Sequence, residues 1–213
     1  MDNQVILQLA AENRMGGVDN LVNIYWALSS ALVAGVGGAV VEIGCYAGRT
    51  SVLLRKVIDH FAPERELHVY DSFQGLPAAG PYDTDYTGEG QLATSVETLL
   101  ATFARWGVDP PVVHPGWFHE TLPTGLPDSI CFAYLDGDLY ESVRTGLECV
   151  YPRLSRHAVV IVDDYCDPEK SPKAFSMFPG AKKACDEFFA DKPEDVSVLV
   201  GAHNLAFGYF RKS

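Results

Sequence analysis

The chain has 213 residues, of which 47% are hydrophobic and 21% charged, a composition typical of globular proteins. Its 16 basic and 28 acidic side chains give a net charge of −12. Because a field of that sign repels a nucleic-acid backbone and an anionic membrane surface, we expect neither as a partner. The length predicts a single α/β domain over residues 1–213, large enough to fold without disulfides.

The five cysteines are odd in number and include no CxxC pair, which argues against a disulfide framework and a zinc site. Reduced thiols, together with an N-terminus that lacks a basic signal region, predict a cytoplasmic protein. The uncharged run over residues 24–41 is long enough to cross a membrane, but serines and glycines interrupt it. We therefore expect a helix, a glycine turn and a buried strand there.

Strands and helices are expected to alternate along the chain. Residues 1–38 form an N-terminal helical segment, and the apolar run AVVEI at 39–43 predicts a buried strand. Further strands are expected at 67–71, 111–114, 130–136, 158–164, 196–200 and 205–210, and helices at 50–61, at 181–190, before Trp106 and in the stretch 141–154. This pattern predicts a doubly wound, mostly parallel sheet with an antiparallel C-terminal strand.

One long irregular segment interrupts this alternation. Residues 74–95 are rich in Gly, Pro, Asp and Thr, and segments of this length and composition often act as lids over binding sites. We expect this segment to shape the site of the acceptor molecule. Four tyrosines are candidates to stack on a ring of that acceptor: Tyr82, Tyr86, Tyr140 and Tyr165.

Parallel sheets bind ligands at the carboxyl ends of their strands. The first strand ends in an ExGxxxG element made of Glu42, Gly44 and Gly48, which departs from the GxGxxG of dinucleotide-binding folds and is typical of S-adenosylmethionine sites. Asp71 ends the second strand, where an acidic side chain can accept hydrogen bonds from ribose, in either S-adenosylmethionine or NAD. Next to it, Phe73 offers a ring for adenine or for core packing.

Carboxylates gather at two later strand ends. Asp136 and Asp138 follow the fourth strand, and Asp163 and Asp164 follow the fifth. We expect these four side chains to meet at one cleft, where their mutual repulsion calls for a cation. Oxygen ligands favour Mg²⁺ over Zn²⁺ and leave Ca²⁺ and Mn²⁺ open. Such a cation would lower the pKa of an acceptor hydroxyl, and a neighbouring carboxylate would take its proton.

Five stretches together resemble the macrocin O-methyltransferase (TylF-type) family. They are VVEIGCYAG (40–48), YDSFQGLP (70–77), GWFHETLP (116–123), YLDGDLYES (134–142) and VDDYCD (162–167). The family consists of Mg²⁺- and S-adenosylmethionine-dependent enzymes of the Rossmann-like class I fold, which methylate sugar hydroxyls in antibiotic biosynthesis. The resemblance implies an O-methyltransferase that acts on a small glycosylated or phenolic natural product.

The resemblance also implies a set of site residues. Asp136, Asp163 and Asp164 would hold the metal, and Asp138 would be the general base. The cofactor-binding residues would be Glu42, Gly44, Cys45, Tyr46, Gly48, Asp71, Ser72, Phe73, Gly116, Trp117, Phe118 and Asp136. Two alternatives stay open, an NAD-linked oxidoreductase on the same sheet and a non-catalytic S-adenosylmethionine-binding module. A homodimer is a further expectation, because the apolar N-terminal helix and the terminal strands could pair.

Overall fold

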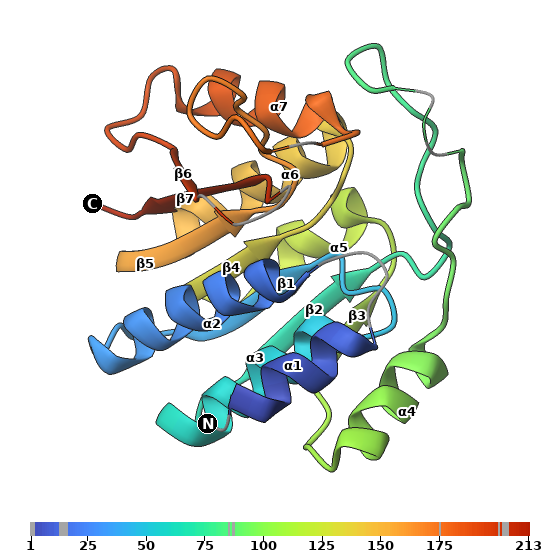
Figure 1. Cartoon of the computed structure of the whole chain (residues 1–213), viewed down its shortest axis with the longest axis vertical. Helices are drawn as coiled ribbons and strands as arrows, with labels where there is room; N and C mark the ends of the chain where they lie inside the picture. Colours follow the sequence, from blue (N-terminus) through green and yellow to red (C-terminus); the bar gives the residue numbers. More distant parts are fainter. Residues whose placement is uncertain are drawn as a thin grey trace.

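The computed structural model describes residues 3–12, 17–84, 86, 88–174, 176–199, 201 and 205–213. In these residues the chain forms a seven-stranded sheet with the order β3-β2-β1-β4-β5-β7-β6 (Figure 1). The strands are β1 (Ala39–Ile43), β2 (Leu67–Asp71), β3 (Val112–Pro115), β4 (Ile130–Leu135), β5 (Leu154–Val162), β6 (Ser197–Leu199) and β7 (Phe207–Arg211). The pairs among β1 to β5 are parallel, and β7 runs antiparallel to both β5 and β6. The predicted fold class is therefore confirmed.

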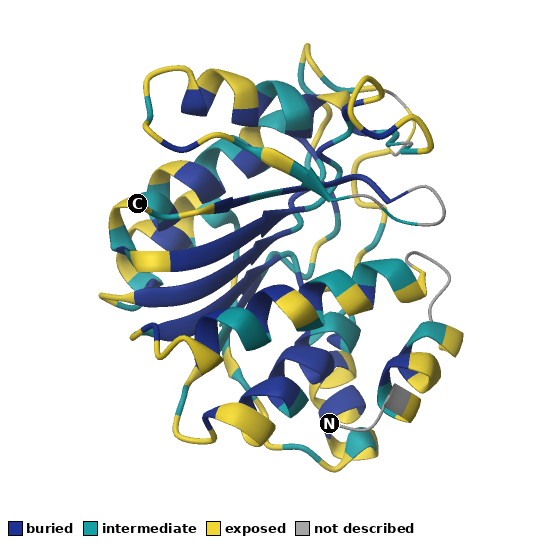
Figure 2. Cartoon of the chain, turned by 60° about the vertical axis from the view of Figure 1, so that its left-hand side comes forward, coloured by how far each residue is buried: buried dark blue, intermediate teal, exposed yellow. Residues whose placement is uncertain are grey.

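The central strands are apolar along their whole length because both faces of the sheet are covered. Every residue of β1 and of β4 is buried, and Figure 2 shows these strands lying between two groups of helices. Continuous apolar runs are what parallel strands need in that position. The exception within β1 is Glu42, an acidic residue that is fully buried among apolar neighbours.

Helices cover the sheet in two groups. On one face, α2 packs on β4 and β5 and contacts α1 and α3, and on the other face α5, α6 and α7 follow one another. The helices are α1 (Asn3–Ala11), α2 (Val18–Val33), α3 (Arg49–Phe61), α4 (Val96–Trp106), α5 (Phe118–Gly125), α6 (Tyr140–Val150), the 3₁₀ turn η1 (Tyr151–Arg153) and α7 (Pro179–Phe189). Among the described residues, no helix is long and apolar enough to cross a membrane.

The order of the strands places a ligand site between β1 and β4. The chain runs outward from β1 to β2 and β3, and then returns to β4 on the opposite side of β1. The crossover connections after β1 and after β4 therefore leave the sheet toward different faces. In open α/β sheets, a crevice forms at the carboxyl ends of the two strands where this direction changes.

Candidate active site

A cavity of about 360 Å³ lies at the carboxyl ends of the central strands. Each of its walls comes from the loop or helix that follows a strand. The lining residues are Gly44, Tyr46, Asp71, Ser72, Gly75, Leu76, Pro77, Leu92, Trp117, Phe118, His119, Asp136, Gly137, Asp138, Glu141, Ser142 and Thr145. The structure thus brings eight of the predicted site residues to one cavity: Gly44, Tyr46, Asp71, Ser72, Trp117, Phe118, Asp136 and Asp138.

The backbones that follow β1 and β4 approach each other closely at Gly44. This residue has φ +85°, and a Cβ atom on it would lie 1.8 Å from the carbonyl oxygen of Asp136. The Asp136 N–H donates to the carbonyl of Ile43 at 2.8 Å, which continues the strand pairing past the end of β4. Only glycine fits this position, because any side chain would overlap backbone atoms.

Asp71 holds the loop after β1 against the loop after β2. Its Oδ2 accepts hydrogen bonds from the N–H groups of Cys45 (3.0 Å) and Tyr46 (2.8 Å), and its Oδ1 accepts one from Phe73 (2.8 Å). A carboxylate offers about four acceptor positions, so three bonds leave room for one more from a ligand. Asp71 therefore shapes the cavity and still presents an acceptor to it.

The remaining predicted cofactor residues on these loops do not line the cavity. Cys45 is buried, and its N–H is bound to Asp71, while Phe73 packs against the core. Gly48, with φ +81°, begins α3 and donates its N–H to the carbonyl of Cys45 at 2.8 Å. Their role in the structure is to fix the loops that carry the cavity wall.

Glu42 lies beneath the cavity, inside the sheet. Its side chain is fully buried, its Oε2 accepts a hydrogen bond from the Ser51 hydroxyl, and its Oε1 has no hydrogen-bond partner among the described residues. Burial, with a smaller contribution from nearby Asp71, raises the pKa of Glu42 to about 8. The carboxyl group is therefore neutral near pH 7. Glu42 was predicted as a cofactor-binding residue, but it does not line the cavity and instead supports the loop after β1.

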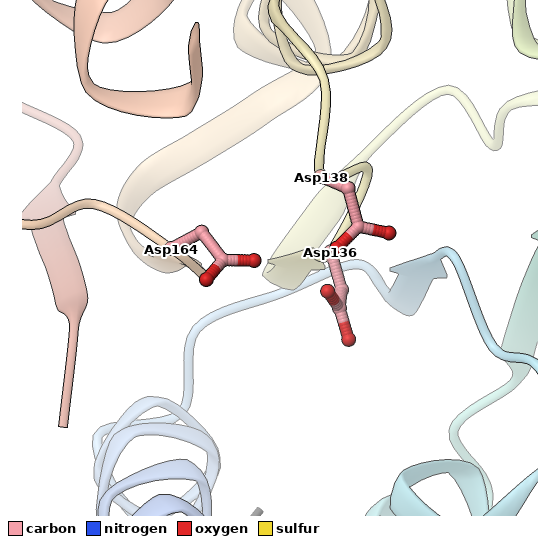
Figure 3. A group of neighbouring side chains, drawn as sticks. All are labelled: Asp136, Asp138 and Asp164. Atoms are coloured by element: carbon pink, nitrogen blue, oxygen red, sulfur yellow. The ribbon is translucent and has the colours of Figure 1, made fainter. Parts of the chain in front are cut away.

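Three aspartates meet beside the cavity, and two of them, Asp136 and Asp138, line it. Asp136 and Asp138 lie between β4 and α6, and Asp164 follows β5. One carboxylate oxygen of each lies within 4.8 Å of the others, and all three side chains are partly buried. Figure 3 shows the Asp164 carboxylate directed toward Asp138 and Asp136. We call these three residues the aspartate group.

The backbone of the aspartate group is unusual. Asp138 has φ +58° and Asp164 has φ +59°, both in the left-handed region that side chains other than asparagine and aspartate seldom adopt. Such conformations persist where the surrounding structure enforces them, and they concentrate at functional sites. Here they turn both carboxylates toward Asp136.

Burial raises the pKa of every carboxyl group in the aspartate group. Burial is the largest cause for each residue, and the neighbouring carboxyl groups add to it, so the pKa values of Asp136 and Asp138 lie well above their usual range. Burial raises the pKa of Asp164 to about 6, although Ser176 donates a hydrogen bond to it at 2.7 Å. Carboxylate oxygens at this spacing suit a hard divalent cation such as Mg²⁺, which needs only one or two of them as ligands. The residues present therefore fit the predicted metal.

Asp163 is not part of the aspartate group, although we predicted it as a metal ligand. Its Oδ2 accepts a hydrogen bond from the Tyr134 hydroxyl, and its Oδ1 accepts one from the N–H of Asp164 at 2.8 Å. Both residues lie in the turn after β5, where the left-handed backbone of Asp164 carries its carboxylate into the group while that of Asp163 stays bound to Tyr134 and to the Asp164 N–H. Asp163 instead fixes the backbone that presents Asp164, and burial raises its own pKa to about 7.

The loop after β3 supplies an aromatic wall. Trp117 and Phe118, at the start of α5, line the cavity as predicted. Gly116 does not line it, but makes the turn that places them. Its φ is +139°, and its N–H donates to the carbonyl of Asp71 at 2.9 Å.

The four tyrosines predicted to stack on the acceptor do not line the cavity. Tyr82 packs on Tyr140, with ring centroids 4.7 Å apart, and Tyr140 donates its hydroxyl hydrogen to Glu187 at 2.6 Å. Tyr165 is buried and donates to Asp186 at 2.9 Å, and Tyr86 is exposed. The segment 74–95 instead contributes Gly75, Leu76, Pro77 and Leu92 to the cavity wall.

Several cavity residues were not predicted from the sequence. The largest set is Glu141, Ser142 and Thr145, which share one face of the first turns of α6. The available signal was that Thr145 lies three residues after Ser142 and four after Glu141, spacings that place side chains on the same helix face directly after Asp138. His119, Leu76, Pro77 and Leu92 also went unpredicted, because nothing in their side chains marks them for a cofactor site.

Comparison with known proteins places the chain in a family. The model of the macrocin-O-methyltransferase (TylF) family matches residues 9–190. A tetracenomycin 4'-O-methyltransferase of Streptomyces olivaceus, which acts on the dimethoxy-rhamnosyl form, is 37% identical over 71% of this chain and 62% of its own length. The demethyldecarbamoylnovobiocin O-methyltransferase of Streptomyces niveus is 34% identical over 85% of this chain and 69% of its own length.

Similar structures support the same placement. The O-methyltransferase NovP matches with a TM-score of 0.78 and 30% identity, over 92% of this chain and 81% of that chain. A calicheamicin methyltransferase, at 21% identity and a TM-score of 0.69, shares the fold. The chain spans 62% of the length of the tetracenomycin relative and 65% of that of a mycinamicin III 3''-O-methyltransferase from Micromonospora griseorubida. With its family model matched over most of its length, this chain belongs to the macrocin-O-methyltransferase family.

Proposed function

We propose that this protein transfers the methyl group of S-adenosylmethionine to a hydroxyl group of a small natural product, with a divalent cation at the aspartate group. The observation that carries the proposal is that two members of the aspartate group, Asp136 and Asp138, line a cavity of about 360 Å³, with Asp164 close behind them. Its other walls are a glycine loop and two aromatic rings. Cavities of this size accommodate a small cofactor.

Different residues of the cavity bind the different parts of the cofactor. The Gly44 loop provides a close backbone approach for the methionine part, Asp71 accepts a hydrogen bond from a ribose hydroxyl, and Trp117 and Phe118 pack on the adenine ring. Asp136 and Asp164 hold the cation, for which we favour Mg²⁺. Asp163 orients the backbone of Asp164 through the hydrogen bond described above.

S-adenosylmethionine supplies an electrophilic methyl group, and a divalent cation bound at the aspartate group lowers the pKa of an acceptor hydroxyl beside it. Asp138 is placed to accept the proton of that hydroxyl in its ionised form, because its carboxylate oxygen lies within 4.8 Å of those of Asp136 and Asp164. As the acceptor oxygen bonds to the methyl carbon, the carbon–sulfur bond breaks and S-adenosylhomocysteine is released. The cavity walls hold the two reactants in line and exclude water.

The relatives support a sugar as the acceptor group. Two of them carry names that specify the 4' position of a rhamnosyl compound and the 3'' position of mycinamicin III. We propose that this chain likewise methylates a sugar hydroxyl in an antibiotic-type pathway. An oxidoreductase acting through NAD finds no support in the family to which the chain belongs.

The setting of the protein is also a proposal. Five free thiols support a cytoplasmic location.

Exposed apolar side chains at Val18, Val22, Trp26 and Val33 recur along α2, which supports a homodimer formed through that helix. Light scattering of the purified protein and of a Trp26→Ser variant tests the homodimer, because a dimer built on this face dissociates when its largest apolar side chain is removed.

The test of the function is a methyl-transfer assay against a panel of rhamnosylated polyketides, deoxysugar macrolides, coumarin glycosides and simple phenols. We expect S-adenosylhomocysteine to form with a glycoside, to cease in excess chelator and to return with Mg²⁺. Asp164→Ala should abolish turnover and keep S-adenosylhomocysteine binding, since Asp164 does not line the cavity. The exposed Asp109→Ala variant is the matched control. Full turnover in chelator would refute the cation, and no binding of S-adenosylhomocysteine would refute the function.

A further inference from the structure

Three segments that follow three different strands meet in a small apolar cluster of their own. Its buried members are Leu76 from the segment between β2 and α4, Leu139 from the loop between β4 and α6, and Phe178 from the segment between β5 and α7. Leu92 and Met177 pack against them. This cluster is separate from the main core, so the outer wall of the cavity has its own packing.

Asp83 forms the polar link beside this cluster. Its Oδ1 accepts a hydrogen bond from the N–H of Tyr140 at 2.9 Å, and its Oδ2 accepts one from the N–H of Gly80 at 3.0 Å. Tyr140 is the first residue of α6, and the preceding Leu139 has no polar side-chain atom to cap the helix. Asp83 therefore caps α6 from a segment 57 residues away in the sequence, where its charge also interacts favourably with the helix dipole.

A third element, α7, leaves space for this link at Gly180. A Cβ atom on Gly180 would lie 2.0 Å from Oδ1 of Asp83 and 2.8 Å from the N–H nitrogen of Tyr140. Neighbouring contacts join the same segments: the Thr84 hydroxyl donates to the carbonyl of Met177 at 2.6 Å, and Lys183 lies over the ring of Tyr82 at 4.4 Å. The three segments thus converge on the Asp83 carboxylate.

We propose that Asp83 is a positioning residue, which fastens the segment between β2 and α4 onto the start of α6 and thereby holds the outer wall of the cavity. The wall residues Leu76, Pro77 and Leu92 belong to that segment. The cap lies two residues after Asp138, so it also fixes the loop that carries the proposed base. Asp83 itself does not line the cavity and acts only through these backbone contacts.

Three variants and one control test this role. Asp83→Ala removes both acceptors, Asp83→Asn keeps one amide oxygen to cap α6, and Gly180→Ala displaces the carboxylate by overlap. Alanine favours helices over glycine, so a role of Gly180 in helix stability alone predicts a more stable Gly180→Ala protein. Gly37→Ala is the control, because a Cβ atom there would meet nothing within 4 Å.

The first readout is amide hydrogen exchange of the free protein at Gly80, at Tyr140 and over residues 88–92. The second is the rate at which S-adenosylhomocysteine dissociates. We expect faster exchange at these amides and about fivefold faster dissociation in Asp83→Ala and Gly180→Ala, since a lost helix cap is worth roughly 1 kcal/mol. Asp83→Asn should lie between these variants and the wild type, and Gly37→Ala should equal the wild type.

The proposal is overturned if Asp83→Ala and Gly180→Ala lower the melting temperature but leave local exchange and ligand dissociation at wild-type values. It is equally overturned if Gly180→Ala only stabilises the protein. The dissociation readout rests on the proposed function, whereas amide exchange is measured without any ligand. If the proposed function fails, the dissociation readout is lost, but amide exchange still decides the role of Asp83.

Discussion

Two acidic sites lie close enough for Glu42 to raise the pKa of Asp136, yet their charges are stabilised in opposite ways. Glu42 sits inside β1, fully buried, with the Ser51 hydroxyl as its hydrogen-bond partner. The aspartate group lies just beyond the strands, partly buried, with three carboxylates in mutual reach and with Asp136 and Asp138 lining a cavity.

The difference shows how position in an α/β sheet decides what a carboxyl group can do. A single carboxyl inside a strand is satisfied by keeping its proton, which its pKa of about 8 allows. Three carboxyl groups at the strand ends cannot all be relieved in this way near neutral pH, because Asp164, with a pKa of about 6, is largely ionised. A divalent cation relieves the whole group at once.

The largest expected effect comes from placing a side chain where the loops after β1 and β4 touch. Gly44 lies between them, and Gly44→Ala would place a Cβ atom 1.8 Å from the Asp136 carbonyl at a φ of +85°. We expect a loss of at least about 4 kcal/mol in the free energy of unfolding, because backbone overlap adds to conformational strain. Urea unfolding measures it.

Gly35→Ala is the matched control, since Gly35 has φ +70° and open space around it. It isolates the conformational strain, which is about 1 kcal/mol. Equal losses in the two variants would mean that the close approach of the two loops contributes nothing to stability.

A smaller effect is expected in how pH and a bound cation change the stability of the protein through the aspartates after β5. The folded-state pKa values of Asp163 and Asp164 rise from 3.8 to about 7 and about 6, so the folded protein binds more protons than the unfolded chain between these values. Stability without a cation should therefore fall as pH rises from about 4 to about 7. Bound cation at a hundredfold its Kd adds about 2.7 kcal/mol.

We expect Mg²⁺ to raise the melting temperature strongly at pH 8 and little at pH 5, because protonated carboxyl groups do not bind it. Sodium chloride of matched ionic strength should reproduce neither effect. A Mg²⁺ effect of the same size at both pH values would contradict a carboxylate site.

The smallest expected effect concerns Glu42 alone. Its pKa rises from 4.5 to about 8, so the neutral form is the native one and stability is lost as pH rises across that interval. Glu42→Gln imitates the neutral carboxyl, and we expect it to change the free energy of unfolding by less than about 2 kcal/mol near neutral pH. It should also reduce by about one proton the pH dependence of that free energy between pH 5 and 8. An unchanged pH dependence would show that Glu42 is ionised in the folded protein.

Much of the fold followed from the sequence because its strands are continuous apolar runs. The predicted strands at 39–43 and 67–71 agree with β1 and β2 residue for residue. Two elements lacked a comparable signal. No separate helix was predicted over α1 within the N-terminal segment, and α5 was not predicted because Pro123 lies inside it and its eight residues are too few for a clear helical period.

The sequence indicated which loops form the candidate site, but it indicated less well which side chains of those loops take part in it. Strand ends in a parallel sheet share one edge, which is why Asp136, Asp138 and Asp164 could be expected together. The direction of each side chain is another matter: β4 ends at Leu135, and Asp138 reaches the group through its left-handed backbone, which no sequence pattern indicates. Asp163 shows the same limit, because the turn after β5 decides which of two adjacent carboxylates joins the aspartate group.

The central claim is that the aspartate group binds one divalent cation beside the cofactor cavity. Its most direct test is calorimetric titration of Mg²⁺, and of Mn²⁺, into the protein saturated with S-adenosylhomocysteine, compared with Asp164→Asn and with Asp109→Asn. We predict one cation per chain for the wild type and for Asp109→Asn, and an affinity weaker by at least about 100-fold for Asp164→Asn, since losing a ligand costs more than losing an outer contact. Absence of binding to the wild type, or equal binding to all three proteins, would contradict the account.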